Sequence, residues 1–158
     1  MKILQVVGYK NSGKTTTIRQ FTEYVKSRGK SVAVIKHHHM DKAVIREEVD
    51  TGKFVASGAE YSILNTPTFS EMTHRHSSDI ITQLNEQLEF LKNSGIDFVF
   101  VEGYKEELFP KITLNYSFGL EQNTDIDDIG LEAVLESFDL RYDREKLLKW
   151  FEAWSDLN

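Results

Sequence analysis

A glycine-rich octet near the start of the chain has the residue types and spacing for binding phosphate. The run Gly8-Tyr9-Lys10-Asn11-Ser12-Gly13-Lys14-Thr15 matches the pattern G-x-x-x-x-G-K-[ST], whose glycines let backbone N–H groups turn toward a phosphate chain. In such a loop the lysine reaches the β- and γ-phosphates and the last hydroxyl binds Mg²⁺. The alternative is a glycine turn with a surface lysine. We predict a phosphate-binding loop with contacts from Gly8, Asn11, Ser12, Gly13, Lys14, Thr15 and Thr16.

An acidic residue at the end of an apolar run is the second candidate. Residues 98–101 are Phe-Val-Phe-Val, and Glu102 and Gly103 follow directly. A carboxylate at the carboxyl end of a buried strand can hold Mg²⁺, a metal-bound water or the attacking water, and the length of Glu leaves these three open. The Gly103 N–H could approach the γ-phosphate. A solvent-exposed carboxylate at a strand end is the alternative.

A third candidate is the basic run that begins Lys36-His37-His38-His39 and opens a long polar segment reaching Lys53. Adjacent residues of an extended segment point to opposite sides, so at most two of the three histidines could bind one metal ion. A metal site, contact with an anion and a plain polar loop all remain open. Farther along, the acidic run 125–130 has Ile129 where a calcium loop needs an oxygen ligand, so we expect a solvated turn there.

The elements that must position these residues alternate between strands and helices. Apolar runs predict strands at 3–7, 32–35, 61–64, 98–101, 111–116 and 131–135. Helical patterns follow the octet as far as Gly29, run from the capping residue Asp79 to Gly95, and begin again after Asp143. This alternation predicts an α/β fold with a mostly parallel sheet covered on both faces, in which ligands bind beyond the carboxyl ends of the strands.

Length and composition favour one soluble domain over residues 1–158. The chain has 158 residues and no Cys, which removes thiolate zinc sites and thiol nucleophiles. Its net charge of −6 argues against general nucleic-acid binding. Residues 1–53 nevertheless carry 11 Lys and Arg against 5 Asp and Glu, which suggests a local site for an anionic ligand. The first apolar run is too short for a membrane span, so we expect a cytoplasmic protein with no membrane contact.

Several short motifs in a fixed order carry a resemblance to a known family. They are the octet with Thr16, Val34-Ile35-Lys36-His37, Asp50-Thr51 followed by Ser57-Gly58-Ala59, Val101-Glu102-Gly103-Tyr104-Lys105 and Pro110-Lys111-Ile112. In these motifs the chain resembles the molybdopterin-guanine dinucleotide biosynthesis adaptor proteins. It departs from them at Glu48-Val49, where the family often has Gly-Lys before the Asp-Thr pair.

The resemblance implies a P-loop NTPase fold, a three-layer sandwich that binds GTP with Mg²⁺ and hydrolyses GTP weakly. It implies catalytic roles for Lys14, Asp50 and Glu102, with Thr15, Asp50 and Glu102 near the metal. The implied partners are a molybdenum cofactor guanylyltransferase and a second copy of the chain, which could cover an edge strand such as 111–116. Lys36, His37 and His38 are then expected to contact molybdopterin or its guanine dinucleotide.

Two other functional classes stay open on the residues alone. The same loop occurs in small-molecule kinases, although no arginine cluster typical of a kinase lid follows Arg46. A module that binds nucleotide without turnover is the second alternative. The chain contains no Asn-Lys-x-Asp motif, so the preference for GTP over ATP comes from the resemblance alone.

Overall fold

The computed structural model describes residues 1–38, 49–115 and 130–157. Contacts within the chain divide it into two compact units. The first unit consists of Met1–His37 and Phe90–Asn158, and the second of His38–Glu89. Whether the two units together make the single predicted domain stays a prediction.

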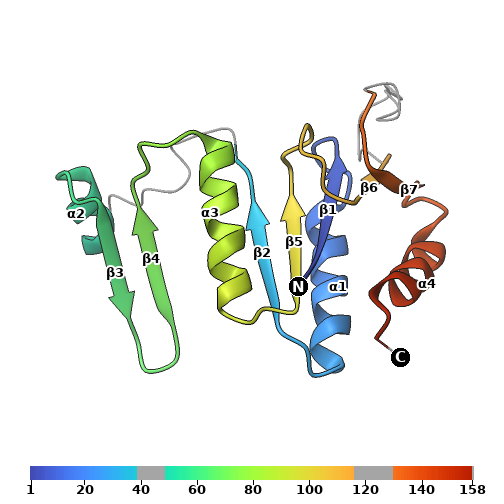
Figure 1. Cartoon of the computed structure of the whole chain (residues 1–158), viewed down its shortest axis with the longest axis horizontal. Helices are drawn as coiled ribbons and strands as arrows, with labels where there is room; N and C mark the ends of the chain where they lie inside the picture. Colours follow the sequence, from blue (N-terminus) through green and yellow to red (C-terminus); the bar gives the residue numbers. More distant parts are fainter. Residues whose placement is uncertain (39–48, 116–129, 158) are drawn as a thin grey trace. The chain divides into compact units, whose positions relative to one another are not determined.

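The first unit is built on a five-stranded sheet whose pairings are all parallel (Figure 1). Its strand order is β2-β5-β1-β6-β7. The predicted α/β class with a mostly parallel sheet is therefore confirmed. The strands are β1 (Lys2–Gly8), β2 (Val32–Lys36), β5 (Phe98–Glu102), β6 (Lys111–Leu114) and β7 (Val134–Phe138).

The two central strands explain why the candidate site residues meet at one edge of this sheet. All of β5 is buried, as is β1 from Leu4 onward, which is the pattern of strands covered on both faces. The register pairs Lys36 with Glu102, and Glu102 with Val6. Because the strands are parallel, their carboxyl ends share one edge, and the glycine loop leaves β1 at that edge.

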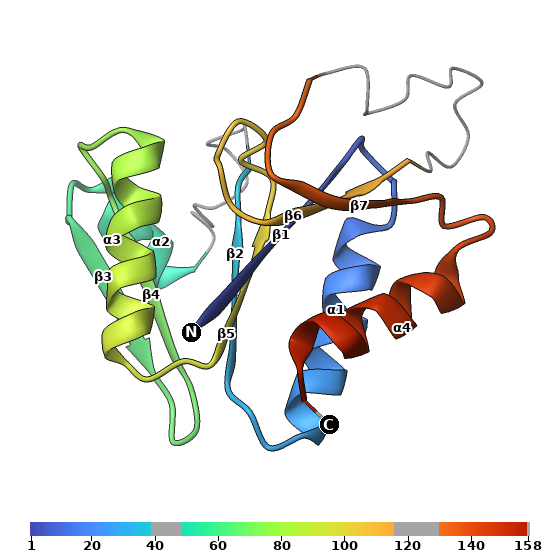
Figure 2. The same ribbon diagram turned by 45° about the vertical axis from the view of Figure 1, so that its right-hand side comes forward.

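Two helices pack together over the core of the first unit, as Figure 2 shows for α1 (Lys14–Ser27) and α4 (Arg144–Ser155). The rings of Phe21 and Phe151 stack with their centroids 3.8 Å apart and an angle of 7° between their planes. Phe100 from β5 lies 5.9 Å from Phe21 and 5.8 Å from Phe151. These contacts hold the middle of α1 against the sheet.

The second unit contains a short helix and an antiparallel hairpin, followed by most of a longer helix. These elements are α2 (Asp50–Ala56), β3 (Tyr61–Asn65), β4 (Ser70–His74) and α3 (Ile80–Asn93). The hairpin forms a separate two-stranded sheet in which Ile63 lies opposite Met72. The carboxylate of Asp79 accepts hydrogen bonds from the Ile81 and Thr82 N–H groups, both at 3.0 Å. The predicted cap of this helix is therefore confirmed.

Four expectations about elements need correction. The strand expected at 61–64 pairs with β4 and not with the parallel sheet. The segment expected to stay a loop until Lys53 already forms α2 from Asp50. The strand expected at 131–135 begins at Val134. Finally, the strand expected at 111–116 is not at an edge, because β6 pairs with both β1 and β7, and Tyr116 lies outside the described residues.

Over the described ranges, no helix is both long enough and apolar enough to cross a membrane.

Candidate functional site

The glycine loop turns sharply between β1 and α1. Asn11 and Gly13 both adopt left-handed backbone conformations, with φ of 65° and 86°. α1 then begins at Lys14 without a side-chain cap on its N-terminus and without an acidic residue in its first turn. The first N–H groups of a helix have no partner within it, and the helix dipole adds partial positive charge there. This helix start is therefore suited to an anion.

Close packing explains the glycine at position 8. A Cβ at Gly8 would lie 2.3 Å from the Ser12 Oγ and 2.8 Å from the carbonyl oxygen of Leu114 on β6. Ser12 itself is fully buried, and its N–H donates to the Tyr9 carbonyl at 3.2 Å. Its hydroxyl has no hydrogen-bond partner in the described part of the chain. The predicted role of Ser12 in phosphate binding stays a prediction.

The ammonium group of Lys14 curls back over its own loop. Its Nζ donates to the Gly8 carbonyl at 3.1 Å and to the Tyr9 carbonyl at 2.6 Å. Burial lowers the pKa of Lys14 below the ordinary lysine value, Lys105 and Lys36 lower it further, and Glu102 raises it. The cation is thus partly removed from water and held by neutral acceptors, which an anionic ligand would replace with full charges.

Glu102 connects the glycine loop with β2 through two polar contacts. The Thr15 hydroxyl donates to Glu102 Oε2 at 3.0 Å, and Lys36 Nζ lies 2.9 Å from Glu102 Oε1. The Glu102 side chain is 9% exposed, against 50% for Lys36. A hydroxyl and a carboxylate side by side suit Mg²⁺, which usually takes few protein ligands and completes its shell with phosphate and water. Thr15 and Glu102 therefore fit a magnesium ion.

The segment after Glu102 is fitted against His37. Gly103 has a φ of 94°, and a Cβ there would lie 3.1 Å from the Cβ of His37. The His37 N–H donates to the Glu102 carbonyl at 2.9 Å, and its ring stacks on Tyr104 with centroids 4.8 Å apart. His37 thus contributes to the shape of the site through packing and its main chain.

Two buried polar residues to which the sequence analysis gave no role hold this segment in place. Gln5 is fully buried, and its Nε2 donates to the carbonyls of Gly103 (2.6 Å) and Tyr104. Lys111 is 1% exposed, and its Nζ donates to the carbonyls of Lys105 (3.0 Å) and Glu107. The available signal was a polar side chain within an otherwise apolar strand. Such a side chain needs buried acceptors, and here they are the carbonyls of the loop after β5.

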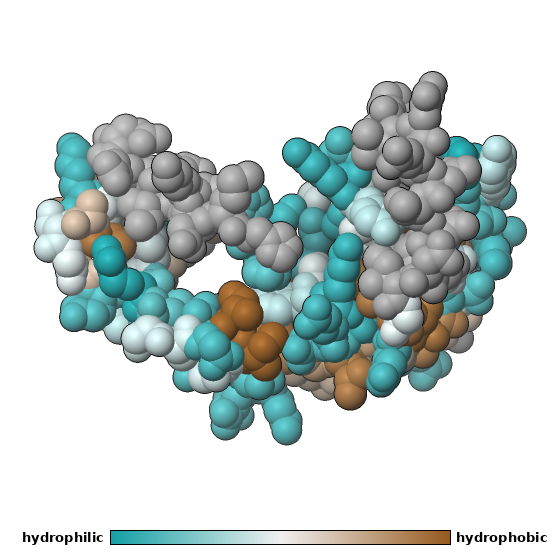
Figure 3. Space-filling model, turned by 90° about the horizontal axis from the view of Figure 1, so that it is seen from above, coloured by the Kyte–Doolittle hydropathy of each residue, from teal (hydrophilic) through white to brown (hydrophobic). Residues whose placement is uncertain are grey.

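The first unit brings most of the predicted site residues together at the carboxyl ends of its strands. Figure 3 views this edge from above, and many of the side chains facing the viewer there are hydrophilic. The residues gathered are Gly8, Asn11, Ser12, Gly13, Lys14, Thr15, Thr16, Lys36, His37, Glu102 and Gly103.

The other predicted residues lie elsewhere in the chain. Asp50 and His38 belong to the second unit. The Asp50 side chain is 83% exposed and forms an ion pair with Lys53 at 3.0 Å. His39, Lys42 and Arg46 lie outside the described residues. Within the described ranges, no group of three or more His, Cys, Asp or Glu side chains could hold a metal ion.

The known proteins that this chain resembles are named for molybdopterin guanine dinucleotide synthesis. Residues 3–135 match the family described as molybdopterin guanine dinucleotide synthesis protein B. The molybdopterin-guanine dinucleotide biosynthesis adapter protein of Haemophilus influenzae is 32% identical over 146 residues, which cover 92% of this chain and 80% of that protein. A Methanocaldococcus jannaschii relative is also 32% identical, and this chain spans 58% of its length.

Solved structures of similar proteins share the fold. Bacillus subtilis MobB is 26% identical, with a TM-score of 0.64 over 87% of this chain and 77% of that one. A MobB homologue from Bacillus stearothermophilus aligns over the whole of both chains with a TM-score of 0.70. Its 24% identity makes this a likeness of fold alone.

Proposed function

The chain belongs to the molybdopterin guanine dinucleotide synthesis protein B family, and on that premise we propose that it is a GTP-binding adapter in molybdopterin guanine dinucleotide biosynthesis. Nucleotide and Mg²⁺ bind where the glycine loop meets Glu102. The observation that carries this proposal is the contact of Thr15 and Lys36 with the Glu102 carboxylate beside the Lys14 ammonium.

Each residue of this constellation has a defined task in binding. The triphosphate draws Lys14 away from the Gly8 and Tyr9 carbonyls, because charged oxygens are stronger acceptors than neutral ones. The Thr15 hydroxyl and the Glu102 carboxylate would hold Mg²⁺, which would neutralise negative charge on the nucleotide. Lys36, which pairs with Glu102 in the free protein, then turns toward the γ-phosphate.

The proposed GTPase activity is weak because the site has few groups that stabilise the transition state. In the described ranges, Thr15 and Glu102 contact each other and Lys36, whereas an arginine finger, where a site has one, is worth about 10³–10⁵ in rate. We keep Asp50 and Glu102 as the proposed acids near water and metal. Asp50→Ala and Glu102→Gln should then slow hydrolysis more than they weaken binding, and equal losses would indicate a purely metal-holding role.

Titration calorimetry with GTP and Mg²⁺ tests the phosphate site. Lys14→Ala should weaken binding by about tenfold or more, equivalent to about 1.4 kcal/mol, because the phosphates lose their main cationic partner. Lys26→Ala is the matched control, since Lys26 is exposed in the last turn of the same helix. Unchanged affinity in Lys14→Ala would show that the glycine loop is not the site.

We also propose a homodimer, supported by the hairpin of the second unit. A two-stranded hairpin is marginal on its own, and this one exposes a series of large apolar side chains: Tyr61, Ile63, Leu64, Phe69 and Met72. A surface of this kind commonly serves as an interface. Light scattering over a range of concentrations should give twice the chain mass of 18.3 kDa, and a single-chain mass at every concentration would contradict the proposal.

The proposed biosynthetic partners are a molybdenum cofactor guanylyltransferase and molybdopterin or its guanine dinucleotide. The predicted pterin contacts were Lys36, His37 and His38. Because Lys36 pairs with Glu102, its removal should affect triphosphate binding as well, whereas His38→Ala tests the pterin contact alone. We expect His38→Ala to weaken molybdopterin binding or stimulation of the guanylyltransferase, while GTP affinity changes less than about threefold. Wild-type behaviour in both assays would refute the contact.

A further inference from the structure

A cavity beside the glycine loop lies on the side away from Glu102. It has a volume of about 140 Å³. Asn11, Thr16 and Gln20 line one wall, and Leu140, Arg144 and Leu148 line the other. A cavity of about 150 Å³ can hold a benzene ring, so this one has room for part of a purine and not for a whole nucleotide. Because the cavity lies beside the glycine loop, we propose that it binds the purine of the bound nucleotide and that Arg144 selects guanine. The inference rests on the proposed function.

The order of the strands determines which end of a nucleotide reaches this cavity. The loop leaves β1, which has β5 and β2 on one side and β6 and β7 on the other. Glu102 and Lys36, which mark the γ-phosphate end, lie at the ends of β5 and β2. The phosphate chain crosses the start of α1 between the two sides. The nucleoside therefore emerges toward the segment that joins β7 to α4, and that segment forms the cavity wall.

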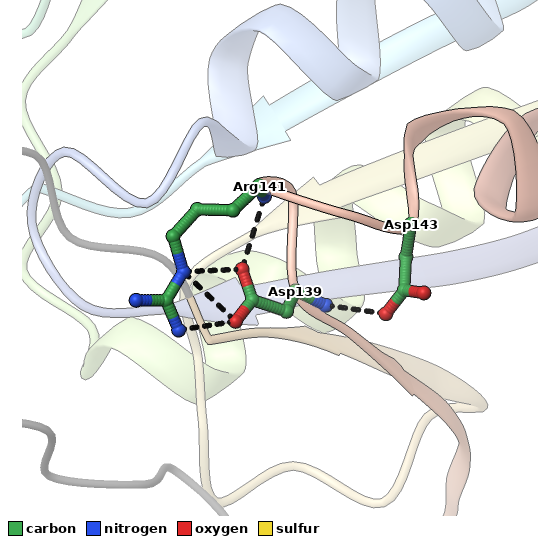
Figure 4. A network of polar contacts seen from close by, with 3 residues as sticks. All are labelled: Asp139, Arg141 and Asp143. Carbon is green, nitrogen blue, oxygen red and sulfur yellow. Dashed lines mark hydrogen bonds and ion pairs between the residues drawn. The ribbon is translucent and has the colours of Figure 1, made fainter.

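Neighbouring polar contacts leave the Arg144 guanidinium available for a ligand. Arg141 forms an ion pair with Asp139, and Asp143 accepts the Asp139 N–H at 2.9 Å (Figure 4). Both nearby carboxylates are thus engaged with other groups. Arg144 donates from Nε to the Leu140 carbonyl at 3.0 Å, and it forms no ion pair among the described residues. Its two terminal nitrogens remain as donors on a residue that lines the cavity.

The edge chemistry of the purines gives this arginine its selectivity. Guanine presents two acceptors, O6 and N7, on one edge, whereas adenine presents an amino donor beside N7. A guanidinium has donors and no acceptor, so it matches guanine and meets the adenine amino group donor to donor. Leu140 and Leu148 supply apolar surface for the faces of the ring. This arrangement favours GTP over ATP without the motif that the sequence lacks.

Binding of GTP, ATP and inorganic tripolyphosphate tests the inference, all with Mg²⁺ and the full chain. Arg144→Met should lower the preference for GTP over ATP by about tenfold, mainly through weaker GTP binding, while tripolyphosphate affinity stays within about twofold. Arg19→Met is the matched control, an exposed arginine on α1 that does not line the cavity. Leu148→Trp should fill the cavity, weakening both nucleotides and sparing tripolyphosphate.

The outcomes separate this inference from the proposed function. If wild type and Arg144→Met prefer GTP equally, Arg144 does not select guanine. If Leu148→Trp binds both nucleotides normally, the purine lies outside the cavity. The phosphate site still stands in both cases. If the wild-type chain binds tripolyphosphate but shows no preference for GTP over ATP, the selective role of Arg144 is also refuted. If it binds none of the three ligands, the proposed function fails together with the inference.

Discussion

Replacing Gly8 with Ala should force the end of β1 away from β6. The new Cβ would lie 2.8 Å from the Leu114 carbonyl oxygen, against 3.4 Å for an ordinary contact, so the strands must separate there by about 0.6 Å. Overpacking of this kind costs about 1–3 kcal/mol. For a chain of this length each kcal/mol lowers Tm by about 2–4 °C, which predicts a fall of about 2–12 °C. Since Gly8 opens the phosphate loop, GTP affinity should fall as well.

Two further variants separate the contributions to this loss. Gly29→Ala is the control, because a Cβ there has no atom within 4 Å and only its φ of 73° is unfavourable. It should lower Tm but leave GTP affinity within about twofold. Gly8→Ala combined with Ser12→Gly removes the 2.3 Å contact with Ser12 Oγ and keeps the contact with Leu114, so it should recover only part of the stability.

Thermal unfolding by circular dichroism and calorimetric titration measure these effects. A wild-type Tm and affinity in Gly8→Ala would refute the packing argument. Full recovery in the double variant would show that the Leu114 carbonyl adds nothing.

Three other outcomes follow from the same structure. GTP affinity should fall as pH rises through the pKa of Lys14, which lies below the ordinary 10.5, because the neutral amine attracts no phosphate. The free energy of unfolding should rise between the lowered pKa and 10.5, since the unfolded chain binds more protons there than the folded chain. Calorimetry across pH should show the fall earlier in Glu102→Gln, because Glu102 raises that pKa. Phe151→Ala removes the ring stacked on Phe21 and should cost about 3–5 kcal/mol in urea unfolding, against under about 1.5 kcal/mol for Phe151→Leu. Gln5→Leu removes two hydrogen bonds to the loop after β5, and it also removes a buried oxygen that has no partner. These two changes oppose each other in stability, so the free energy of GTP binding should change more than the free energy of unfolding.

The central strands and the phosphate loop could be predicted because local sequence determines them. The apolar runs of β1 and β5 require burial on both faces, and the octet needs only the strand before it and the helix after it. β4 carries one apolar residue, Met72, in its five, so nothing local indicates a strand. Pairing with β3 creates it, and pairing depends on the turn between them.

Backbone conformation and tertiary contacts account for the other differences. β7 starts at Val134 because Ala133 has a φ of 58° and cannot continue a strand, although its carbonyl still accepts the Lys111 N–H at 3.0 Å. Gln5 appears in the sequence as a polar interruption of an apolar run. The carbonyls that it serves belong to a loop almost a hundred residues later, which no local pattern can show.

The distance along the chain between Thr15 and Glu102 has a consequence for how this protein folds. The two residues are 87 positions apart, and both neighbours of β1 in the sheet, β5 and β6, are synthesised long after it. Contacts between distant segments pay the entropy of loop closure before they gain energy, and this slows folding. During translation the apolar run of β1 therefore waits without a strand beside it until β5 emerges. The nucleotide site is completed late, and a ribosome-bound chain that ends before Phe98 should neither bind GTP nor resist proteolysis.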